Sequence, residues 1–145
     1  MLRSKATKNP KPHVYRKDHD MILRNFRNEA RDDYLEAILQ ITLEKGYCRS
    51  IDIANELAVS KPSVSVAVNK LEESGLLVMG EDKLLRLTEE GRALAEVTLE
   101  KHVYLMSFLM QAGVEKEIAE KEACAMEHGI SNESFRLLRE RYPVS

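Results

Sequence analysis

Apolar residues recur at helical spacing in three segments of the first half of the chain. These segments cover residues 28–44, 50–57 and 61–73, with an apolar side chain at about every third or fourth position. Ser50 and Ser60 stand at the starts of the second and third segments, where a side-chain hydroxyl can cap the free amide groups of a helix. We therefore predict three helices, the last two joined by a tight connection.

The spacing then changes from that of helices to that of strands. Two short apolar runs, residues 76–79 and 83–87, flank the turn sequence Gly80-Glu81-Asp82 and predict a β-hairpin. Helical spacing returns over three further segments, namely residues 89–112 behind an N-cap at Thr88, residues 115–128, and a last segment capped by Ser131.

The order helix, helix, turn, helix and hairpin is that of a winged helix-turn-helix. The predicted fold class is therefore mainly α. We place an N-terminal winged helix-turn-helix domain at residues 28–90 and an all-helical second domain at residues 91–145.

Charge is distributed unevenly along the chain. Residues 1–31 hold nine Lys and Arg against three Asp and Glu, whereas the remaining residues have a net charge of −8. We predict a basic N-terminal arm over residues 1–27, either bound to a polyanionic partner or solvated and partly disordered. Pro10 and Pro12 are expected to prevent a helix before about Val14.

The composition is typical of a helix-rich protein of the reducing cytosol. The 145 residues are 43% hydrophobic and 32% charged, and two cysteines are too few for a disulfide framework. No apolar run reaches the roughly 18 residues of a membrane-spanning helix, and the basic N-terminus lacks the apolar core of a secretory signal. The lack of a phosphate-binding glycine motif argues against a nucleotide-binding enzyme, and the lack of a nucleophile–base pair argues against a hydrolase.

The third predicted helix carries residue types suited to reading DNA. In a winged helix-turn-helix this helix enters the major groove with its N-terminal residues first, and cations on the hairpin can reach phosphates. The predicted DNA-contacting residues are Ser60, Lys61, Pro62, Ser63, Ser65, Asn69, Lys70, Lys83 and Arg86.

The charge of this region leaves a second interpretation open. Residues 46–90 have a net charge of −3, whereas a DNA-binding domain usually presents a basic face. Segregated cations, the basic arm or bound divalent ions can offset this charge. The alternative is a winged helix that serves as a protein-interaction module.

A second chemical signal lies on the helix predicted at residues 115–128. Cys124, Glu127 and His128 are three and four positions apart, so a thiolate, a carboxylate and an imidazole share one helical stripe. Such a stripe can form half of a divalent-metal site. The alternative is an exposed Glu and His beside a buried Cys.

Three further residues have side chains that can ligate a metal. Asp33 and Glu36 are three positions apart on the first helix, and alone they are typical of a solvated acidic face. His102 lies on the long helix beside the apolar run 103–110, and alone it is typical of a core histidine.

Together these blocks resemble the diphtheria-toxin-repressor and manganese-transport-regulator family of metal-activated winged-helix repressors. The resemblance extends from residue 33 to about residue 142, roughly three quarters of the chain, and it depends on the order and spacing of the blocks. The matching blocks are Asp33-Tyr34-Leu35-Glu36, Ile53-Ala54-Asn55-Glu56-Leu57, Ser60-Lys61-Pro62-Ser63-Val64-Ser65, Leu87-Thr88-Glu89-Glu90-Gly91-Arg92, Lys101-His102 and Glu122-Ala123-Cys124-Ala125-Met126-Glu127-His128.

The resemblance implies that the second domain dimerises and binds metal, and it implies a role for each candidate ligand. Asp33 and Glu36 match ligand positions of the manganese branch. His102, Glu127 and His128 match ligands that both branches share. The resemblance thus implies that ligands from three separate helices meet.

Other positions depart from one branch or the other. Cys124 matches the iron branch, because the manganese branch has at that position a glutamate that bridges two ions. Met106 and Glu120 stand where the iron branch has a glutamate and a histidine ligand, so its ancillary site is incomplete here. The chain also ends near Ser145 without the SH3-like third domain of longer members, which is typical of the short manganese-branch proteins.

We therefore expect a metal-dependent repressor of metal-uptake genes, acting as a cytoplasmic homodimer on a double-stranded DNA operator. Oxygen ligands favour Mn(II), with Fe(II) close behind, and the thiolate also admits Co(II) or Zn(II). We expect the apolar residues Val103, Leu105, Phe108 and Leu109 to form the dimer interface, an intrachain core, or both. The competing hypothesis is a metal-independent winged-helix regulator that senses a small molecule or thiol oxidation.

Overall fold

The computed structural model describes the backbone of residues 12–145 and the side chains from residue 29 onward. It confirms the mainly helical fold with one small hairpin. The elements are α1 (Pro12–Lys45), α2 (Ser50–Leu57), α3 (Lys61–Glu73), β1 (Leu77–Met79), β2 (Leu85–Leu87), α4 (Glu89–Gln111), α5 (Lys116–Glu127) and α6 (Asn132–Arg141).

The first helix begins earlier than the sequence analysis predicts. α1 starts at Pro12 and continues through residue 28, so no break separates the predicted arm from the winged domain. Pro12 was expected to prevent a helix, but proline at the first helical position is favourable because the amide there needs no intrahelical acceptor. The charge-based prediction for the arm falls on residues 1–11 and on the side chains of residues 12–28, which lie outside the described part of the chain.

The predicted helix caps are confirmed with one correction. Hydroxyl groups cap α3, α4 and α6 by accepting a backbone N–H bond, and these caps are Ser60, Thr88 and Ser131. Ser50 is not an N-cap, because it is already the first residue of α2 and Arg49 takes the cap position. The Asp52 carboxylate accepts a hydrogen bond from the Arg49 amide over 2.9 Å, which replaces the expected hydroxyl cap.

The hairpin pairs antiparallel strands that are shorter than predicted. Leu77 lies opposite Leu87 and Met79 lies opposite Leu85. Lys83 was assigned to the second strand, but its φ of 64° is left-handed and its amide donates to the Gly80 carbonyl over 3.0 Å. Residue 83 therefore belongs to the turn, which leaves its side chain at the tip of the wing.

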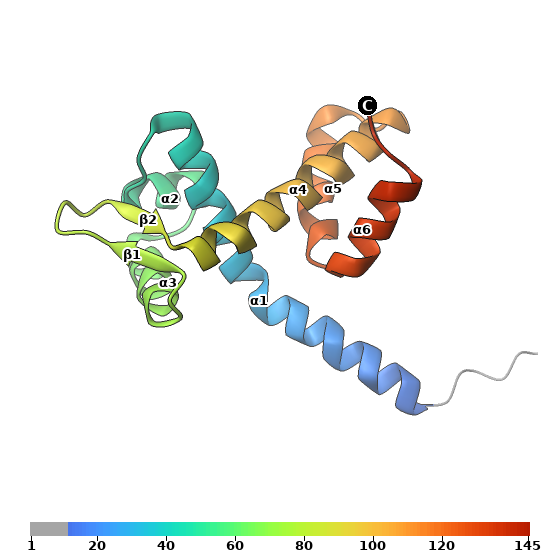
Figure 1. The fold of residues 1–145 in the computed structure, drawn as a ribbon, viewed down its shortest axis with the longest axis horizontal. Coiled ribbons are helices and arrows are strands. Elements are labelled where there is room, and N and C mark those ends of the chain that lie inside the picture. The colour runs from blue at the N-terminus through green and yellow to red at the C-terminus, as the bar shows by residue number, and fades with distance from the viewer. Residues whose placement is uncertain (1–11) are drawn as a thin grey trace, which may run out of the picture.

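Two apolar clusters divide the molecule into two bodies that α4 joins (Figure 1). The larger cluster packs α1, α2, α3 and the hairpin against the first turns of α4. The smaller cluster joins the later part of α4 to α5 and α6, and its buried members are Tyr104, Leu105, Ala123 and Phe135. α1 also packs on α4, so the two bodies meet along these helices.

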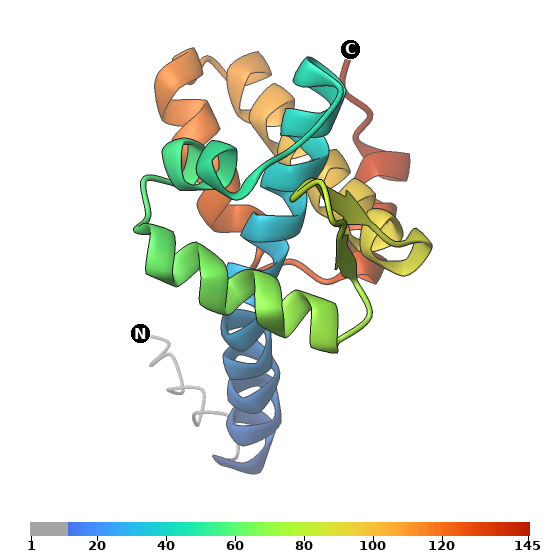
Figure 2. The ribbon, with the colours of Figure 1, turned by 90° about the vertical axis from the view of Figure 1, so that its left-hand side faces the viewer.

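α3 lies at the outer surface of the winged body, as Figure 2 shows. Its buried face consists of Val64, Val68 and Leu71, and its other face is open to solvent. Among the described residues, no helix is long and apolar enough to cross a membrane.

The apolar run on α4 is divided between interior and surface. Leu105 is buried in the smaller cluster, Leu109 is half-buried, and Val103 and Phe108 are exposed. The structure thus places part of this run in the intrachain core and leaves part of it free to contact another molecule.

Candidate metal centre

Six side chains from three helices gather in two groups where α1 passes the end of α5. One group contains Asp33, Cys124, Glu127 and His128, and the other contains Glu36, His102 and Glu127. Within each group the potential ligand atoms all lie within 4.8 Å of one another. Glu127 belongs to both groups, so its two carboxylate oxygens connect them.

Helical spacing explains how each element presents its side chains. Residues three or four positions apart lie on one face of a helix, so Asp33 and Glu36 project together from α1. The same rule aligns Cys124 and Glu127 at the end of α5, and His128 follows as the C-cap residue. The final residues of α5 therefore face α1, and His102 on α4 completes the second group.

Direct contacts hold the three helices together at this point. His128 Nε2 lies 2.9 Å from Asp33 Oδ1, which links α5 to α1. His102 Nδ1 lies 3.0 Å from Glu127 Oε2, which links α4 to α5. His128 Nε2 also lies 3.4 Å from Glu127 Oε1. Polar side chains therefore already bridge the helices that a shared cation would connect.

The environment of Glu127 fits a metal ligand better than a purely structural carboxylate. Its side chain has 0% exposure, and among the described residues its Oε1 is the one buried side-chain oxygen without a hydrogen-bond partner. Leaving a buried carboxylate oxygen without a donor costs about 1–3 kcal/mol or more. A divalent cation bound between the carboxylate, imidazole and thiolate donors of these groups would remove that cost.

The site is electrostatically strained without a cation. Burial, followed by the charge of Glu127 and a hydrogen bond to it, raises the pKa of Glu36 to about 8. Burial lowers the pKa of His128, but hydrogen bonds to Asp33 and Cys124 and the charges of Asp33 and Glu127 outweigh it and raise this pKa to about 10. Near neutral pH, protons therefore neutralise part of the clustered negative charge.

These protons predict a steep pH dependence of metal binding. A metal ion binds only to an ionised Glu36 and a neutral His128. Metal binding must therefore displace one proton from each of these two side chains. Between pH 6 and 8 we expect the affinity for Mn²⁺ to rise about tenfold per pH unit for each displaced proton. Calorimetric titration across this range measures the rise, and an affinity independent of pH would contradict it.

The stability of the metal-free protein should change in the opposite direction. The folded-state pKa values of Glu36 and His128 lie above their ordinary values of 4.5 and 6.5. The folded state therefore binds these protons more tightly than the unfolded state does. The resulting stabilisation is lost as pH rises from about 4.5 to 8 for Glu36 and from about 6.5 to 10 for His128. Thermal unfolding of the protein in the presence of a chelator, measured across this pH range, tests whether stability falls as pH rises.

The burial pattern at the end of α5 is the opposite of the one expected if these three residues had no role in metal binding. That alternative places a buried Cys beside an exposed Glu and His, whereas Cys124 is exposed and both Glu127 and His128 are buried. Cys124 lines an open cleft together with Asp33, Glu36 and His102. The thiol therefore lies at the solvent side of the candidate centre.

The two positions expected to depart from the iron branch lie outside both groups. Met106 is partly buried against the smaller apolar cluster, and Glu120 is exposed at the edge of the same cleft. Across the described residues, the two groups that share Glu127 are the clusters with metal-ligand geometry.

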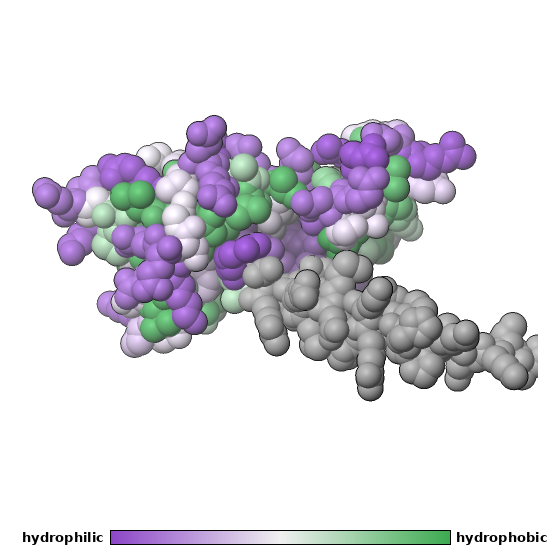
Figure 3. All heavy atoms as spheres, turned by 60° about the horizontal axis from the view of Figure 1, so that its bottom comes forward, coloured by the Kyte–Doolittle hydropathy of each residue, from purple (hydrophilic) through white to green (hydrophobic). Residues whose placement is uncertain are grey.

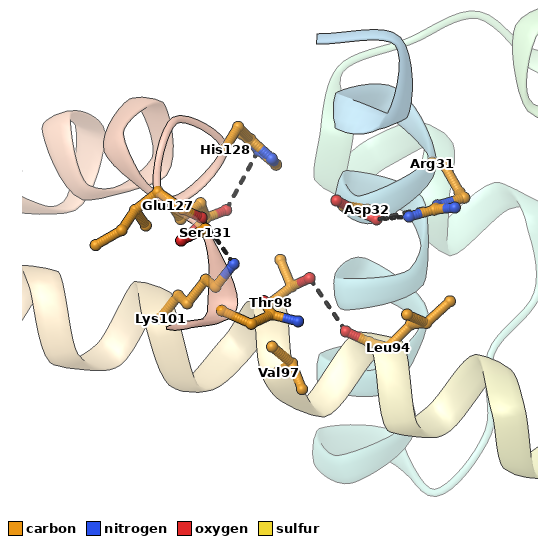
Figure 4. A pocket seen from close by; sticks show the side chains of 11 residues that line it. Arg31, Asp32, Leu94, Val97, Thr98, Lys101, Glu127, His128 and Ser131 are labelled. Carbon is orange, nitrogen blue, oxygen red and sulfur yellow. Dashed lines mark hydrogen bonds and ion pairs between the residues drawn. The ribbon is translucent and has the colours of Figure 1, made fainter. Parts of the chain in front are cut away.

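Lys101 is a supporting residue that appears in a matching sequence block but received no role from the sequence. Its side chain is buried, and its ammonium donates a hydrogen bond to the Ile130 carbonyl over 3.0 Å. Figure 4 shows it rising from α4 toward the turn that carries His128, across a pocket of about 280 Å³ from Arg31 and Asp32 on α1. Burial lowers the pKa of Lys101. Isolated buried lysines are rare, and here the Ile130 carbonyl and the charges of Asp32 and Glu127 favour the ammonium group.

The residues predicted to contact DNA are brought together on one body. All nine are exposed, seven of them on or just before α3 and two on the hairpin. Arg86 pairs with Asp82 through hydrogen bonds of 2.8 and 3.3 Å, so this guanidinium is engaged in the free protein. Apolar patches lie between hydrophilic ones on this body in the space-filling view (Figure 3).

Comparisons with known proteins assign both bodies to one family. Residues 28–85 match the family model described as "Iron dependent repressor, N-terminal DNA binding domain". Residues 88–142 match "Iron dependent repressor, metal binding and dimerisation domain".

Curated relatives agree with these matches. The transcriptional regulator MntR of Escherichia coli is 38% identical over 119 residues, which are 80% of this chain and 77% of the relative. The transcriptional regulator MntR of Bacillus subtilis is 35% identical over 102 residues, which are 70% of this chain and 72% of the relative.

Solved structures show the same architecture. The crystal structure of IdeR from T. acidophilum has a TM-score of 0.67 and 32% identity, covering 78% of this chain and 54% of that chain. The structure of the manganese regulator SloR has a TM-score of 0.68 and 29% identity, covering 77% and 54%. The present chain thus spans about half the length of these two proteins.

Proposed function

The chain belongs to the iron-dependent repressor family of metal-dependent transcriptional regulators, and we propose that it represses metal-uptake genes by binding their operators when Mn(II) or Fe(II) is bound. The observation that carries the proposal is the shared position of Glu127, which is buried in both donor groups and has one oxygen that accepts no hydrogen bond. We infer that Asp33, Glu36, His102, Cys124, Glu127 and His128 are the metal ligands.

The donor chemistry supports this choice of metals. Three carboxylates and two imidazoles suit Mn²⁺ and Fe²⁺, whereas the Cys124 thiolate increases the affinity for Fe²⁺, Co²⁺ or Zn²⁺. A bound cation supplies positive charge that neutralises the clustered carboxylates. The donors gather from several sides and would fill the coordination positions of a bound ion. This supports a regulatory centre rather than a hydrolytic one, because a hydrolytic metal keeps one coordination position open for water or substrate.

The placement of the ligands supports a coupling between the two bodies. Asp33 and Glu36 come from α1, which packs inside the winged body, while the other donors come from α4 and the end of α5. Bridging contacts between these helices restrict the orientation of the winged body relative to the second one. DNA affinity increases when a larger fraction of molecules holds the binding-competent orientation.

The proposed partners are double-stranded DNA and a second copy of the chain. Exposed apolar residues on α4, among them Val103 and Phe108, support a dimer interface in the body that matches a dimerisation domain. A two-fold dimer presents two α3 helices to successive major grooves, about 34–36 Å apart. We place the protein in the cytoplasm, where such an operator is accessible.

The proposed function is tested by titrating DNA binding with metal. A duplex selected from a random pool in the presence of Mn²⁺ serves as the operator, and fluorescence anisotropy measures affinity with Mn²⁺, Fe²⁺, Co²⁺, Zn²⁺ or chelator. We expect DNA affinity to rise about 5- to 150-fold with the activating metal. Equal affinity with metal and chelator would exclude the metal switch. If binding then responded to Cys124 oxidation, the metal-independent regulator would be favoured.

The exposed lysine at the start of α3 gives a separate prediction. If Lys61 contacts a phosphate, Lys61→Gln should lower the slope of log affinity against log salt concentration by about one per subunit. Lys121→Gln, an exposed lysine on α5, serves as a control with the same change of charge. Equal slopes for the two variants would place Lys61 away from the DNA backbone.

A further inference from the structure

A groove of about 320 Å³ runs between α1 and α3 in the winged body. α3 contacts α1 where the two helices cross, as Figure 2 shows. Arg31 and Tyr34 of α1 line one side of the groove, and Val66 and Lys70 of α3 line the other. None of the six candidate metal ligands borders it. Small-molecule sites have volumes of about 300–1,000 Å³, so the groove is large enough for a small ligand.

The surface of the groove is mainly apolar. Tyr34 and Leu71 are buried, Ala67 is half-buried, and Val66 is 55% exposed. The aromatic ring and these aliphatic groups leave a concave apolar surface open to water. Covering such a surface with the apolar part of a ligand is favourable.

One polar group in the groove has no partner within the described residues. Tyr34 is 9% exposed, yet its hydroxyl forms no hydrogen bond with any residue from 29 to 145. A buried tyrosine hydroxyl usually has such a partner. The hydroxyl is not sealed from solvent, and the side chain lines the groove, so a molecule in the groove can reach it. The hydroxyl can then donate a hydrogen bond to an acceptor on that molecule.

The charged side chains that line the groove are cations. They are Arg31 and Lys70, and no Asp or Glu lines the groove. Arg31 pairs with the neighbouring Asp32 over 3.1 Å through Nε and Nη2, so its Nη1 can still donate to a ligand. Lys70 forms no ion pair within the described residues. Two cations beside a free hydroxyl donor favour a carboxylate as the bound group.

These features together select one class of ligand. A metal cation is disfavoured, because the groove offers no carboxylate and already holds two positive charges. An inorganic phosphate or the DNA backbone can use the cations but leaves the apolar surface in water. A carboxylate on a flat aromatic ring satisfies all three features, since the ring can stack against Tyr34 while the carboxylate meets the cations and the hydroxyl.

We propose that the groove between α1 and α3 binds a small aromatic carboxylate, and that this ligand opposes DNA binding. Ser63 and Lys70 line the groove and are also among the residues predicted to contact DNA, so ligand and operator compete for the same side chains. The competition rests on the proposed function, whereas the binding of the ligand does not. The protein thus responds to an organic anion as well as to a metal ion.

Calorimetry of the full-length protein with saturating Mn²⁺ tests the binding, with 2-naphthoate as the probe. A ligand of this size should bind with a Kd of about 0.1–1 mM. 2-Naphthamide has the same rings without the charge, and inorganic phosphate has charge without rings. We expect each of them to bind at least about tenfold more weakly than 2-naphthoate. If either bound as tightly as 2-naphthoate, the inference would be overturned.

Two variants locate the probe in the groove. Tyr34→Phe removes only the hydroxyl, and loss of a hydrogen bond to a charged group should weaken 2-naphthoate binding by about tenfold. Ala30→Glu adds a carboxylate to the lining of the groove and should also weaken binding. Tyr142→Phe is the matched control, since it makes the same change at a residue that is 55% exposed at the end of α6, and it should bind like the wild type. Wild-type affinity in Tyr34→Phe or in Ala30→Glu would overturn the inference.

Operator binding measures the competition. When the concentration of 2-naphthoate is about ten times its Kd, the Mn²⁺-loaded wild type should lose about tenfold in affinity for an operator selected from random duplexes. Tyr34→Phe should lose only about twofold at the same concentration. If operator binding does not depend on metal but 2-naphthoate binding still depends on Tyr34, the proposed function fails and the ligand site is supported. If 2-naphthoate binds as expected and operator affinity stays unchanged, the competition is overturned.

Discussion

Glu127→Gln is expected to abolish metal-dependent DNA binding while leaving the fold intact. The substitution removes the charge from the one carboxylate that both donor groups share, so both are weakened at once. Loss of a partner outside the metal's direct ligands already lowers metal affinity by about 10- to 100-fold. Loss of a shared ligand should therefore lower Mn²⁺ affinity by about 100-fold or more.

Three measurements separate this effect from unfolding. Glutamine has nearly the shape of glutamate and removes a buried charge, so circular dichroism should show an unchanged helix content. Calorimetry then gives the Mn²⁺ affinity, and anisotropy gives the affinity for operator DNA. Glu120→Gln is the matched control, since Glu120 lies on the same helix and lines the same cleft but belongs to neither group. Retention of wild-type metal affinity by Glu127→Gln would refute the proposed centre.

Combining Asp33→Asn with Glu36→Gln is expected to separate metal binding from DNA binding. Four donors remain on α4 and at the end of α5, so the double variant should still bind a cation, with reduced affinity. The donors that α1 contributes are lost, and metal then no longer links the winged body to α5. The 5- to 150-fold increase in DNA affinity expected of the wild type should fall to about twofold or less.

A control on the same helix keeps the change of charge constant. Glu29→Gln combined with Asp32→Asn also removes two negative charges from α1 but alters neither donor group. This control should keep the metal-induced increase in DNA affinity. Before DNA is added, calorimetry must confirm that each variant is saturated with metal. A double variant that remained fully activated by metal would show that the coupling does not pass through α1.

Much of the secondary structure was predictable from local signals. The hairpin and the three hydroxyl caps arise from residues close together in sequence, and the structure confirms them. The errors are local as well. Ser50 resembled a cap, but it is already helical and the Asp52 carboxylate accepts from the Arg49 amide, and Pro12 resembled a helix breaker although it begins α1.

The candidate site was predictable only in pieces. The spacing of Cys124, Glu127 and His128 indicates one stripe on a helix, but it does not show which of them is buried. Burial depends on how α4 packs against both α1 and α5, and this arrangement leaves the thiol exposed while enclosing the carboxylate and the imidazole. The family resemblance indicated that the six residues meet, and the structure brings them together.

By itself, the sequence determined the order and type of the elements, which side chains share a helical face, and which family pattern the chain carries. Those properties depend on hydrogen bonds and side-chain directions within about one helical turn. Tertiary structure alone decided that Glu127 serves both donor groups and that Lys101 supports the turn beside His128. These outcomes depend on contacts such as that between Asp33 and His128, 95 residues apart, because packing of whole helices brings such residues together.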